Sequence, residues 1–193
     1  SSCTIPEGVT ELPSYLFYYC SSLKEVNLPS TLTTIGYGAF DTCGIESLTI
    51  PEGVTTIGGV SFYGSSLSEI SLPSTLTSIG RYGFAETKLT QITLNDGLES
   101  IGDMAFYASP LTELTIPDSV TSVGSNVVSS CSYLTTLNIG AGVQDLYQPI
   151  CYDYALKTIT VSEDNPYLVV GEDGALYNAD YTDLVAVPYM QSD

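Results

Sequence analysis

Apolar residues recur along this chain in a short, regular pattern. An apolar residue that usually precedes a proline returns every 22 or 23 residues, and a second apolar residue stands two positions before it. Residues two apart point to the same face of a β-strand, so each unit predicts a short strand with one buried face. The first set is Ile5, Leu28, Ile50, Leu72, Leu94, Ile116, Ile139 and Val161; the second is Cys3, Val26, Leu48, Ile70, Ile92, Leu114, Leu137 and Ile159.

The second half of each unit has its own apolar frame, of which Ile45–Ser66 is a clear example. Two aliphatic residues three apart are followed by glycine and then by a large apolar residue. The last position is Phe17, Phe40, Phe62, Phe84 and Phe106, and then Val128 and Cys151. One unit is too short to bury its apolar face, but stacked units share a continuous core. The period therefore predicts a mainly β repeat solenoid, with a parallel sheet on one side and turns or short strands on the other.

The repeats divide the chain into a solenoid and a terminal segment. Residues 1–22 form a degenerate first coil, and about seven repeats follow up to residue 162. Because the chain starts inside a repeat, we expect further repeats upstream. From residue 163 the period stops, and short strands are predicted around Val169–Val170, Ala175–Tyr177 and Leu184–Val187. We expect residues 163–193 to form a β-hairpin cap over the last coil and its open sheet edge.

The repeat resembles a known family. The pattern L-x-x-I-x-L-P-x-x-L-x-x-I-G-x-x-A-F-x-x-C is similar to the BspA-type leucine-rich repeat of bacterial surface proteins. Its best copies are Leu23–Cys43 and Leu111–Cys131, although the second carries Val127 and Val128 in place of Ala-Phe. Residues 173–188 are similar to the segment that follows the repeats in BspA-like proteins. The resemblance implies a right-handed coil in an exported or cell-surface bacterial protein that adheres to host matrix, mucosal or microbial surface proteins.

Charge excludes two classes of partner. Four basic residues stand against 22 acidic ones, which gives a net charge of −18. Nucleic acids and anionic membranes both require basic patches, so neither is expected to bind. The sequence has no apolar run long enough to span a bilayer and no export signal. We therefore expect no direct membrane insertion, and the location outside the cell is what the resemblance implies.

Catalytic residues are hard to find in this sequence. Histidine is absent, so Ser and Cys triads lack their usual base, and the three lysines stand in no distinctive motif. Glu25, Glu69 and Glu113 recur 44 residues apart, which places them on alternate coils. Adjacent strands lie about 4.8 Å apart, so these carboxylates would be roughly 10 Å apart, wide even for inverting glycosidases. We predict no catalytic residues, no cofactor and no enzymatic activity.

Neither the cysteines nor the acidic residues of the cap follow a metal-site pattern. All five cysteines fall on positions that point into the core, where a thiol acts as a small apolar group. Cys20 and Cys43, on adjacent coils, are the pair that could be oxidised. The sequence contains no C-x-x-C spacing, so no zinc site is predicted. A Ca²⁺ site in the cap could draw on carboxylates that match no EF-hand, and turn formation explains them more simply: Glu163, Asp164, Glu172, Asp173, Asp180 and Asp183.

Two surfaces remain as candidates for protein binding. On the sheet they are the outward strand positions Glu25, Asn27, Thr49, Glu69, Ser71, Gln91, Thr93, Glu113 and Thr115; on the opposite loops they are Tyr18, Tyr37, Tyr63, Tyr82, Tyr107 and Tyr152. Tyrosine is enriched at interfaces, whereas a Thr-rich strand face also serves β propensity and solubility alone. The sequence thus predicts a protein-binding or adhesion module, and the alternative is a structural spacer with no ligand of its own.

Overall fold

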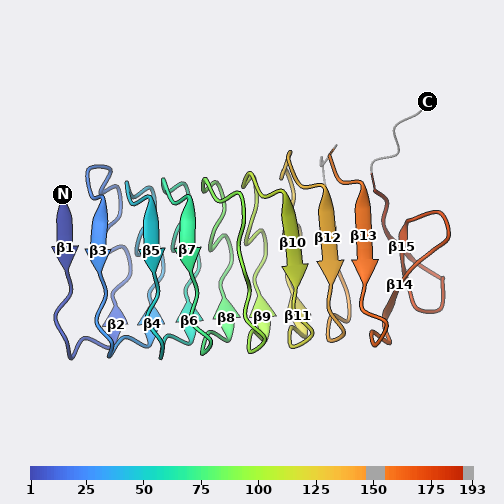
Figure 1. Cartoon of the computed structure of the whole chain (residues 1–193), viewed down its shortest axis with the longest axis horizontal. Coiled ribbons are helices and arrows are strands. Elements are labelled where there is room, and N and C mark those ends of the chain that lie inside the picture. Colours follow the sequence, from blue (N-terminus) through green and yellow to red (C-terminus); the bar gives the residue numbers. More distant parts are fainter. Residues whose placement is uncertain (147–154, 189–193) are drawn as a thin grey trace.

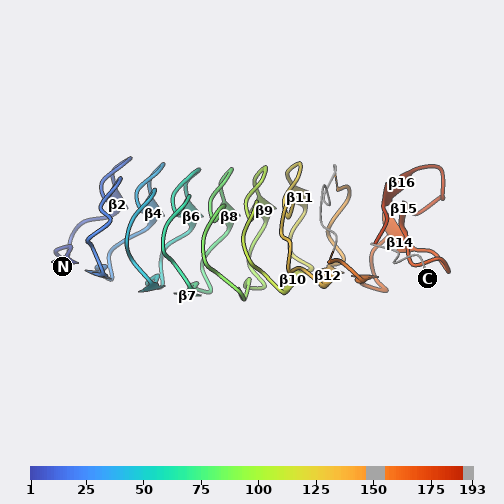
Figure 2. The same ribbon diagram turned by 90° about the horizontal axis from the view of Figure 1, so that it is seen from above.

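The computed structural model describes residues 1–146 and 155–188, and those residues contain no helix. The chain winds into a mainly β solenoid of about seven turns. Each turn runs along a strand of one sheet, bends, passes through a shorter strand on the opposite side and returns through a loop (Figure 1). Seen from above, successive turns stack side by side along one axis (Figure 2). The predicted repeat solenoid is confirmed.

The longer strands pair in parallel between successive coils. Cys3 lies opposite Val26, and Leu114 lies opposite Leu137, so the inward positions of successive repeats stack on one another. The hydrogen-bonded groups are β1–β3, β5–β7 and β10–β12–β13. Their strands are β1 (Ser2–Thr4), β3 (Glu25–Asn27), β5 (Ser47–Thr49), β7 (Glu69–Ser71), β10 (Glu113–Ile116), β12 (Thr136–Ile139) and β13 (Thr158–Val161).

The strand pattern departs from expectation at residues 91–94, which form no strand. The predicted sheet positions Gln91 and Thr93 therefore do not lie on a strand, and this part of the prediction is wrong. Asn95 follows in the slot where neighbouring coils carry proline. Its amide nitrogen donates to the carbonyl of Pro73, and its amide oxygen accepts from Gly97 N at 3.1 Å. The bond with Gly97 is a local side-chain to backbone bond, a type that competes with regular secondary structure, and the bond with Pro73 joins two coils.

On the opposite side, six two-residue strands form one continuous parallel sheet. They are β2 (Glu11–Leu12), β4 (Thr34–Ile35), β6 (Thr56–Ile57), β8 (Ser78–Ile79), β9 (Ser100–Ile101) and β11 (Ser122–Val123), paired in chain order. The glycine that follows these strands allows the coils to approach closely. A Cβ on Gly80 would lie 2.4 Å from the backbone nitrogen of Gly59, so only hydrogen fits there.

A row of stacked phenylalanines fills the core. The rings of Phe40, Phe62 and Phe84 lie nearly parallel, with centroids 5.2 and 5.1 Å apart. Phe17 and Phe106 extend the row at 5.2 and 5.9 Å. Aliphatic side chains from both sheets surround the rings, and most of them are buried. In the next coil the equivalent position is occupied by Val128, which is also buried. The repeated large apolar residue therefore connects the coils into one core.

Cysteine, serine and threonine occupy the position three residues after each phenylalanine. Ser109 Oγ donates to Phe84 O at 2.7 Å, and Cys131 Sγ donates to Phe106 O at 3.0 Å. Cys43 is buried, and burial raises the pKa of its thiol. Cys20 and Cys43 are both free thiols here. The core placement of these residues is confirmed, and Cys3 and Cys20 are half-buried against the core. Cys151 lies outside the described residues.

The terminal segment folds into an antiparallel sheet of three strands, that is, two successive hairpins. The strands are β14 (Leu168–Val170), β15 (Leu176–Asn178) and β16 (Leu184–Ala186), close to the predicted positions. Leu168, Leu176 and Ala186 are buried and belong to the same core cluster as the repeats. The segment thus extends the apolar core beyond β13 (Figure 1). The division into a solenoid at 1–162 and a cap at 163–193 stays a prediction.

Candidate functional site

The loop after each short strand is built from two tight turns. In the second coil, Ala39 N donates to Gly36 O at 3.3 Å and Cys43 N donates to Phe40 O at 3.2 Å. The third residue of each turn has a positive φ, 61° at Gly38 and 52° at Thr42, as a type II turn requires. This geometry directs Ala39, Phe40 and Cys43 into the core and turns the side chains of Tyr37 and Asp41 away from it; Tyr37 is exposed, whereas Asp41 is largely covered by its neighbours.

The same backbone geometry recurs in later coils even without glycine. Val60, Tyr82 and Met104 hold the equivalent positive φ, at 59°, 55° and 52°. A left-handed backbone is disfavoured for aromatic residues and more so for β-branched ones. Bonds between coils stabilise it: the amide of Val60 donates to Arg81 O at 2.7 Å, and that of Tyr82 donates to Asp103 O at 2.9 Å. The outer side chains are therefore held on a hydrogen-bonded frame.

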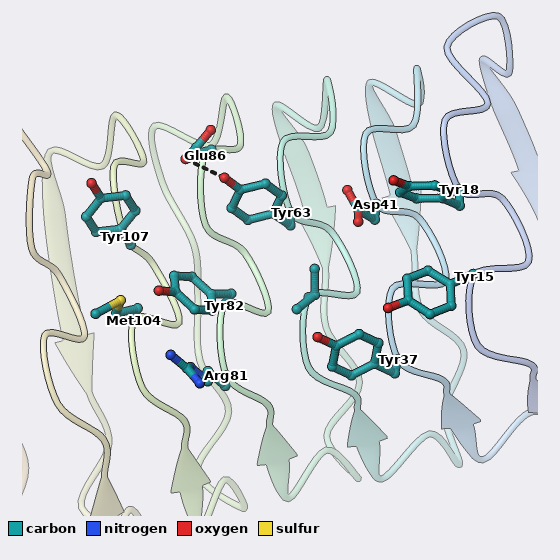
Figure 3. Close-up of a pocket in the computed structure, with 11 residues that line it drawn as sticks. Tyr15, Tyr18, Tyr37, Asp41, Tyr63, Arg81, Tyr82, Glu86, Met104 and Tyr107 are labelled. Atoms are coloured by element: carbon teal, nitrogen blue, oxygen red, sulfur yellow. Dashed lines mark hydrogen bonds between the residues drawn. The ribbon is translucent and has the colours of Figure 1, made fainter.

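These outward side chains line an open groove of about 660 Å³ that runs across the coils. We call it the tyrosine groove. Its side chains stand in three rows along the solenoid axis, with Glu86 at the rim (Figure 3). All of them are central turn residues. The first row holds Tyr37 and Arg81; the second holds Tyr15, Tyr82 and Met104; and the third holds Tyr18, Asp41, Tyr63 and Tyr107. Val60 also lines the groove and has the same turn position as Tyr82 and Met104.

Within the groove the tyrosine rings meet edge to face. The Tyr82 ring centroid lies 6.1 Å from that of Tyr63 and 6.4 Å from that of Tyr107, at angles close to 90°. Tyr15 makes the same kind of contact with Tyr18 and Tyr37, with centroids 5.5 Å apart in both pairs. Edge-to-face packing is a favourable arrangement of aromatic rings. The groove thus contains two tyrosine clusters, one at each end.

Charged groups stand between and beside these clusters. Tyr63 donates its phenol hydrogen to Glu86 Oε1 at 2.7 Å, and this bond raises the pKa of Tyr63 to about 12. Asp41 is buried and accepts a hydrogen bond from Thr42 Oγ1 at 2.8 Å. The guanidinium of Arg81 lies 4.9 Å from the Tyr82 ring centroid, a cation–π contact. Two carboxylates against one guanidinium give the groove lining an acidic balance.

The structure brings together most of the predicted loop tyrosines. Tyr18, Tyr37, Tyr63, Tyr82 and Tyr107 all line the groove, although they belong to three rows. Tyr152 lies outside the described residues. Sequence reasoning missed the remaining lining residues, and counting positions from the repeated phenylalanine of each coil would have found several of them. They are Tyr15, Asp41, Val60, Arg81, Glu86 and Met104.

The second candidate surface is the sheet face, where the predicted side chains point outward. Glu25, Asn27, Thr49, Glu69, Ser71, Glu113 and Thr115 are exposed on their strands, and Gln91 and Thr93 are exposed off a strand. Several polar groups bond to one another across coils. Asn138 Nδ2 donates to Glu113 Oε1 at 2.8 Å and to Thr115 Oγ1 at 3.0 Å, and Thr160 donates to Asn138. These hydrogen bonds satisfy some of the polar groups of the sheet face within the chain, so those groups do not require a ligand.

Three acidic residues of the cap, Asp173, Asp180 and Asp183, accept hydrogen bonds within its turns. Asp173 accepts from Tyr177 Oη at 2.7 Å and from Ala175 N at 3.1 Å, which lowers the pKa of Asp173. Asp183 Oδ2 accepts from Asn178 Nδ2 at 3.0 Å. Within residues 1–146 and 155–188, no three carboxylates or thiols gather as metal ligands would. Over the same residues, no helix has the length and hydropathy to cross a membrane.

Comparisons with known proteins agree with this architecture. The model of the BspA type leucine-rich repeat region matches in six copies, over residues 1–89 and 55–170. The crystal structure of a leucine-rich repeat protein from Bacteroides ovatus is similar, with a TM-score of 0.68, 22% identity, and coverage of 84% of this chain and 45% of that one. A leucine-rich cell surface protein from Faecalibacterium prausnitzii has a TM-score of 0.51 and 26% identity, covering 100% and 47%.

The chain thus spans less than half the length of either relative. Comparison with the curated proteins gave no match.

Proposed function

Starting from the fact that this chain belongs to the BspA-type leucine-rich repeat family, we propose that it is a protein-binding module acting outside the bacterial cell. Its role is adhesion, without catalysis, to host matrix, mucosal or microbial surface proteins. The tyrosine groove is the contact surface. The name of the Faecalibacterium relative, a cell surface protein, supports the location.

The observation that carries this proposal is the set of tyrosines on a fixed backbone. Tyr15, Tyr18 and Tyr37 remain between 47% and 49% exposed even though their rings pack on one another. Tyrosine provides a large amphipathic contact area with few rotatable bonds, and it is enriched among residues that dominate binding energy. Because the loops are bonded from coil to coil, little conformational entropy is lost when a partner binds.

The chemistry of the groove favours binding over catalysis. Its carboxylates are already engaged, Glu86 by Tyr63 and Asp41 by Thr42. Both carboxylates accept hydrogen bonds from hydroxyl groups, and the chain has no histidine to act as a base for such a hydroxyl. Carboxylates that are fixed by hydroxyl groups in this way contribute negative charge and a defined shape to a binding surface.

A spacer without a ligand is the second candidate function. The bonds among Glu113, Thr115 and Asn138 favour it, because they show polar surface groups satisfied within the chain. A spacer and an adhesin differ in one measurable respect. The isolated adhesin binds a partner, whereas the isolated spacer does not.

The test is binding of the purified chain to immobilised fibronectin, fibrinogen, collagen and mucin, at low and at physiological salt. We expect saturable binding to at least one of these that survives physiological salt and is weakened by Tyr107→Ala. Tyr133→Ala is the matched control, because Tyr133 is 65% exposed and does not line the groove. Binding that salt alone abolishes would reflect only the charge of an acidic chain, and absence of binding would favour the spacer.

A further inference from the structure

We propose that the tyrosine groove holds a site for a quaternary ammonium group, the trimethylated cation that choline and trimethyllysine carry. Its walls are the rings of Tyr63, Tyr82 and Tyr107, and Glu86 supplies a negative charge at its rim (Figure 3). This inference rests on the proposed binding function of the groove and names the chemical group that the groove recognises. Three features support it: the angles between the rings, an unfilled position between two of them, and the charges beside them.

The tyrosine rings meet at right angles and therefore form corners. Tyr63 and Tyr82 have centroids 6.1 Å apart and planes at 89°, and Tyr82 and Tyr107 have centroids 6.4 Å apart and planes at 85°. Two perpendicular rings allow one small group to lie against the faces of both. A cation in such a corner lies within about 6 Å of two ring centroids, the range in which the negative face of an aromatic ring attracts it. Proteins bind quaternary ammonium ligands with sets of aromatic faces arranged in this way.

The space between Tyr63 and Tyr107 is left unfilled by the coil that separates them. Both tyrosines directly follow the phenylalanine of their coil, and on the coil between them this position is Ala85, whose side chain is fully buried. Tyr82 borders the same space from the second row (Figure 3). All three rings are half-buried, so part of each remains accessible to a small ligand.

The charges beside these rings favour a cation. Glu86 is exposed and lies at the phenol end of Tyr63, with a carboxylate oxygen 2.7 Å from the phenol oxygen. The guanidinium of Arg81 lies 4.9 Å from the Tyr82 centroid, so this ring already accepts one cation. Arg81 lies on the side of Tyr82 opposite Tyr63 and Tyr107 and does not occupy the corners that they form (Figure 3). The net charge of −18 adds a long-range attraction for cations.

A quaternary ammonium suits this site better than other cations. An ordinary ammonium group is strongly hydrated and donates hydrogen bonds, for which the ring faces offer no oxygen acceptors. A trimethylated nitrogen has no hydrogen to donate, and its methyl groups pack against ring faces while the charge is attracted by them. A metal ion would require several oxygen ligands, and no group of three metal-ligating side chains occurs in the part of the chain that the structure describes.

The test is a nuclear magnetic resonance titration of the whole chain with choline at physiological salt, followed on isotope-labelled tyrosine rings. One comparison ligand is the neutral analogue of choline in which carbon replaces nitrogen, and the other is ethanolamine, which carries the charge without the methyl groups. We expect choline to bind at least about tenfold more tightly than either. A short peptide with trimethyllysine is titrated in parallel, and the tighter of the two trimethylated ligands identifies the source of the group.

Single substitutions locate the site. Tyr63→Leu should weaken choline binding by about tenfold, whereas Tyr63→Phe keeps the ring and should stay within about threefold of the wild type. Glu86→Gln should weaken binding by about threefold, and Arg81→Gln should tighten it, because a nearby positive charge is removed. Tyr133→Leu is the control, since Tyr133 is exposed and does not line the groove. Circular dichroism of each variant confirms that it is folded.

Equal binding of choline and ethanolamine would overturn the inference, because it would show attraction by charge alone. Equal binding of the neutral analogue would overturn it in favour of apolar contact, and weaker binding by Arg81→Gln would assign the site to an anionic group. If neither trimethylated ligand binds but a matrix protein binds in a manner sensitive to Tyr107→Ala, the recognised group is wrong and the protein-binding function stands. If no trimethylated ligand and no matrix protein binds, both proposals fail.

Discussion

The phenol of Tyr63 and the carboxylate of Glu86, which come from adjacent coils, are joined by a hydrogen bond of 2.7 Å. This bond links two neighbouring turns across the surface of the tyrosine groove. Because the carboxylate accepts the phenol hydrogen, it stabilises the protonated form of Tyr63 and raises its pKa to about 12. The relationship leads to a prediction that does not depend on any ligand.

We predict that Tyr63 ionises near pH 12 and that Glu86→Gln returns its pKa toward 10. A raised pKa means that the stabilising effect of the bond is fully present below about pH 10, the usual tyrosine value, and is lost as the pH rises through about 12. The measurement is ultraviolet titration of tyrosinate, comparing the wild type with Tyr63→Phe. A difference curve centred near pH 10 would contradict the predicted pKa.

The buried hydroxyl groups of Ser65 and Ser109 provide a matched pair for stability. Ser109 Oγ donates to Phe84 O at 2.7 Å, whereas Ser65 Oγ is buried with no hydrogen-bond partner. Ser109→Ala should lower the free energy of unfolding by about 0.5–1.5 kcal/mol, because the carbonyl of Phe84 loses one of two hydroxyl donors and keeps only Thr87 Oγ1, at 3.0 Å. Ser65→Ala should be neutral or stabilising. Urea denaturation measures both, and equal losses in the two variants would contradict the assignment.

The phenylalanine row should be most sensitive at its centre. Phe62 is fully buried between Phe40 and Phe84, with centroids 5.2 and 5.1 Å away. Phe62→Ala should lower the free energy of unfolding by about 3–5 kcal/mol, through lost burial and a cavity between the coils. Phe17→Ala, at the end of the row, should have a smaller effect. Thermal denaturation followed by circular dichroism tests the order, and the reverse order would show that the row does not connect the coils.

Gly59 and Gly80, which lie on neighbouring coils, should differ sharply in how far substitution by alanine lowers stability. On Gly80 a Cβ would lie 2.4 Å from Gly59 N, so Gly80→Ala must push two coils apart and should destabilise by at least about 1–3 kcal/mol. On Gly59 the nearest atoms lie 3.2 Å away, and other coils carry Tyr37 or Arg81 at this position. Gly59→Ala should change stability by less than about 0.5 kcal/mol. The midpoint of chemical denaturation distinguishes them, and a tolerated Gly80→Ala would contradict the close approach.

The core could be predicted from the sequence because its signals are local and repeated. Apolar residues two apart gave the strands, and the glycine and phenylalanine frames gave the loops and the core. The break at residues 91–94 was missed, because Ile92 and Leu94 keep the two-residue spacing of the other coils and that spacing does not reveal a missing strand. The presence of Asn95 at the usual proline position did not by itself reveal the contact between Asn95 and Pro73.

The arrangement of side chains in the groove could not be predicted from the sequence, for a different reason. Val60 and Tyr82 adopt a left-handed backbone that their side chains disfavour, so their own propensities do not predict the turn. The hydrogen bonds that their amides donate to carbonyl groups of the next coil stabilise it. Hence the tyrosines could be named as surface candidates and their offsets counted from each phenylalanine, but the edge-to-face contacts between the rows and the bond between Tyr63 and Glu86 could not be predicted.

The most direct test of the central claim compares the two faces of the solenoid for one ligand. The measurement is the dissociation constant for whichever matrix protein the wild type binds most tightly. It is repeated for the double variant Tyr63→Ala/Tyr107→Ala on the groove and for Glu69→Ala/Glu113→Ala on the sheet face.

We expect the groove variant to weaken binding by about 30-fold or more, since central tyrosines act as hot spots, and the sheet variant to remain within about twofold of the wild type. Circular dichroism of each variant confirms that it is folded. A loss confined to the sheet variant would contradict the account and assign binding to the opposite face.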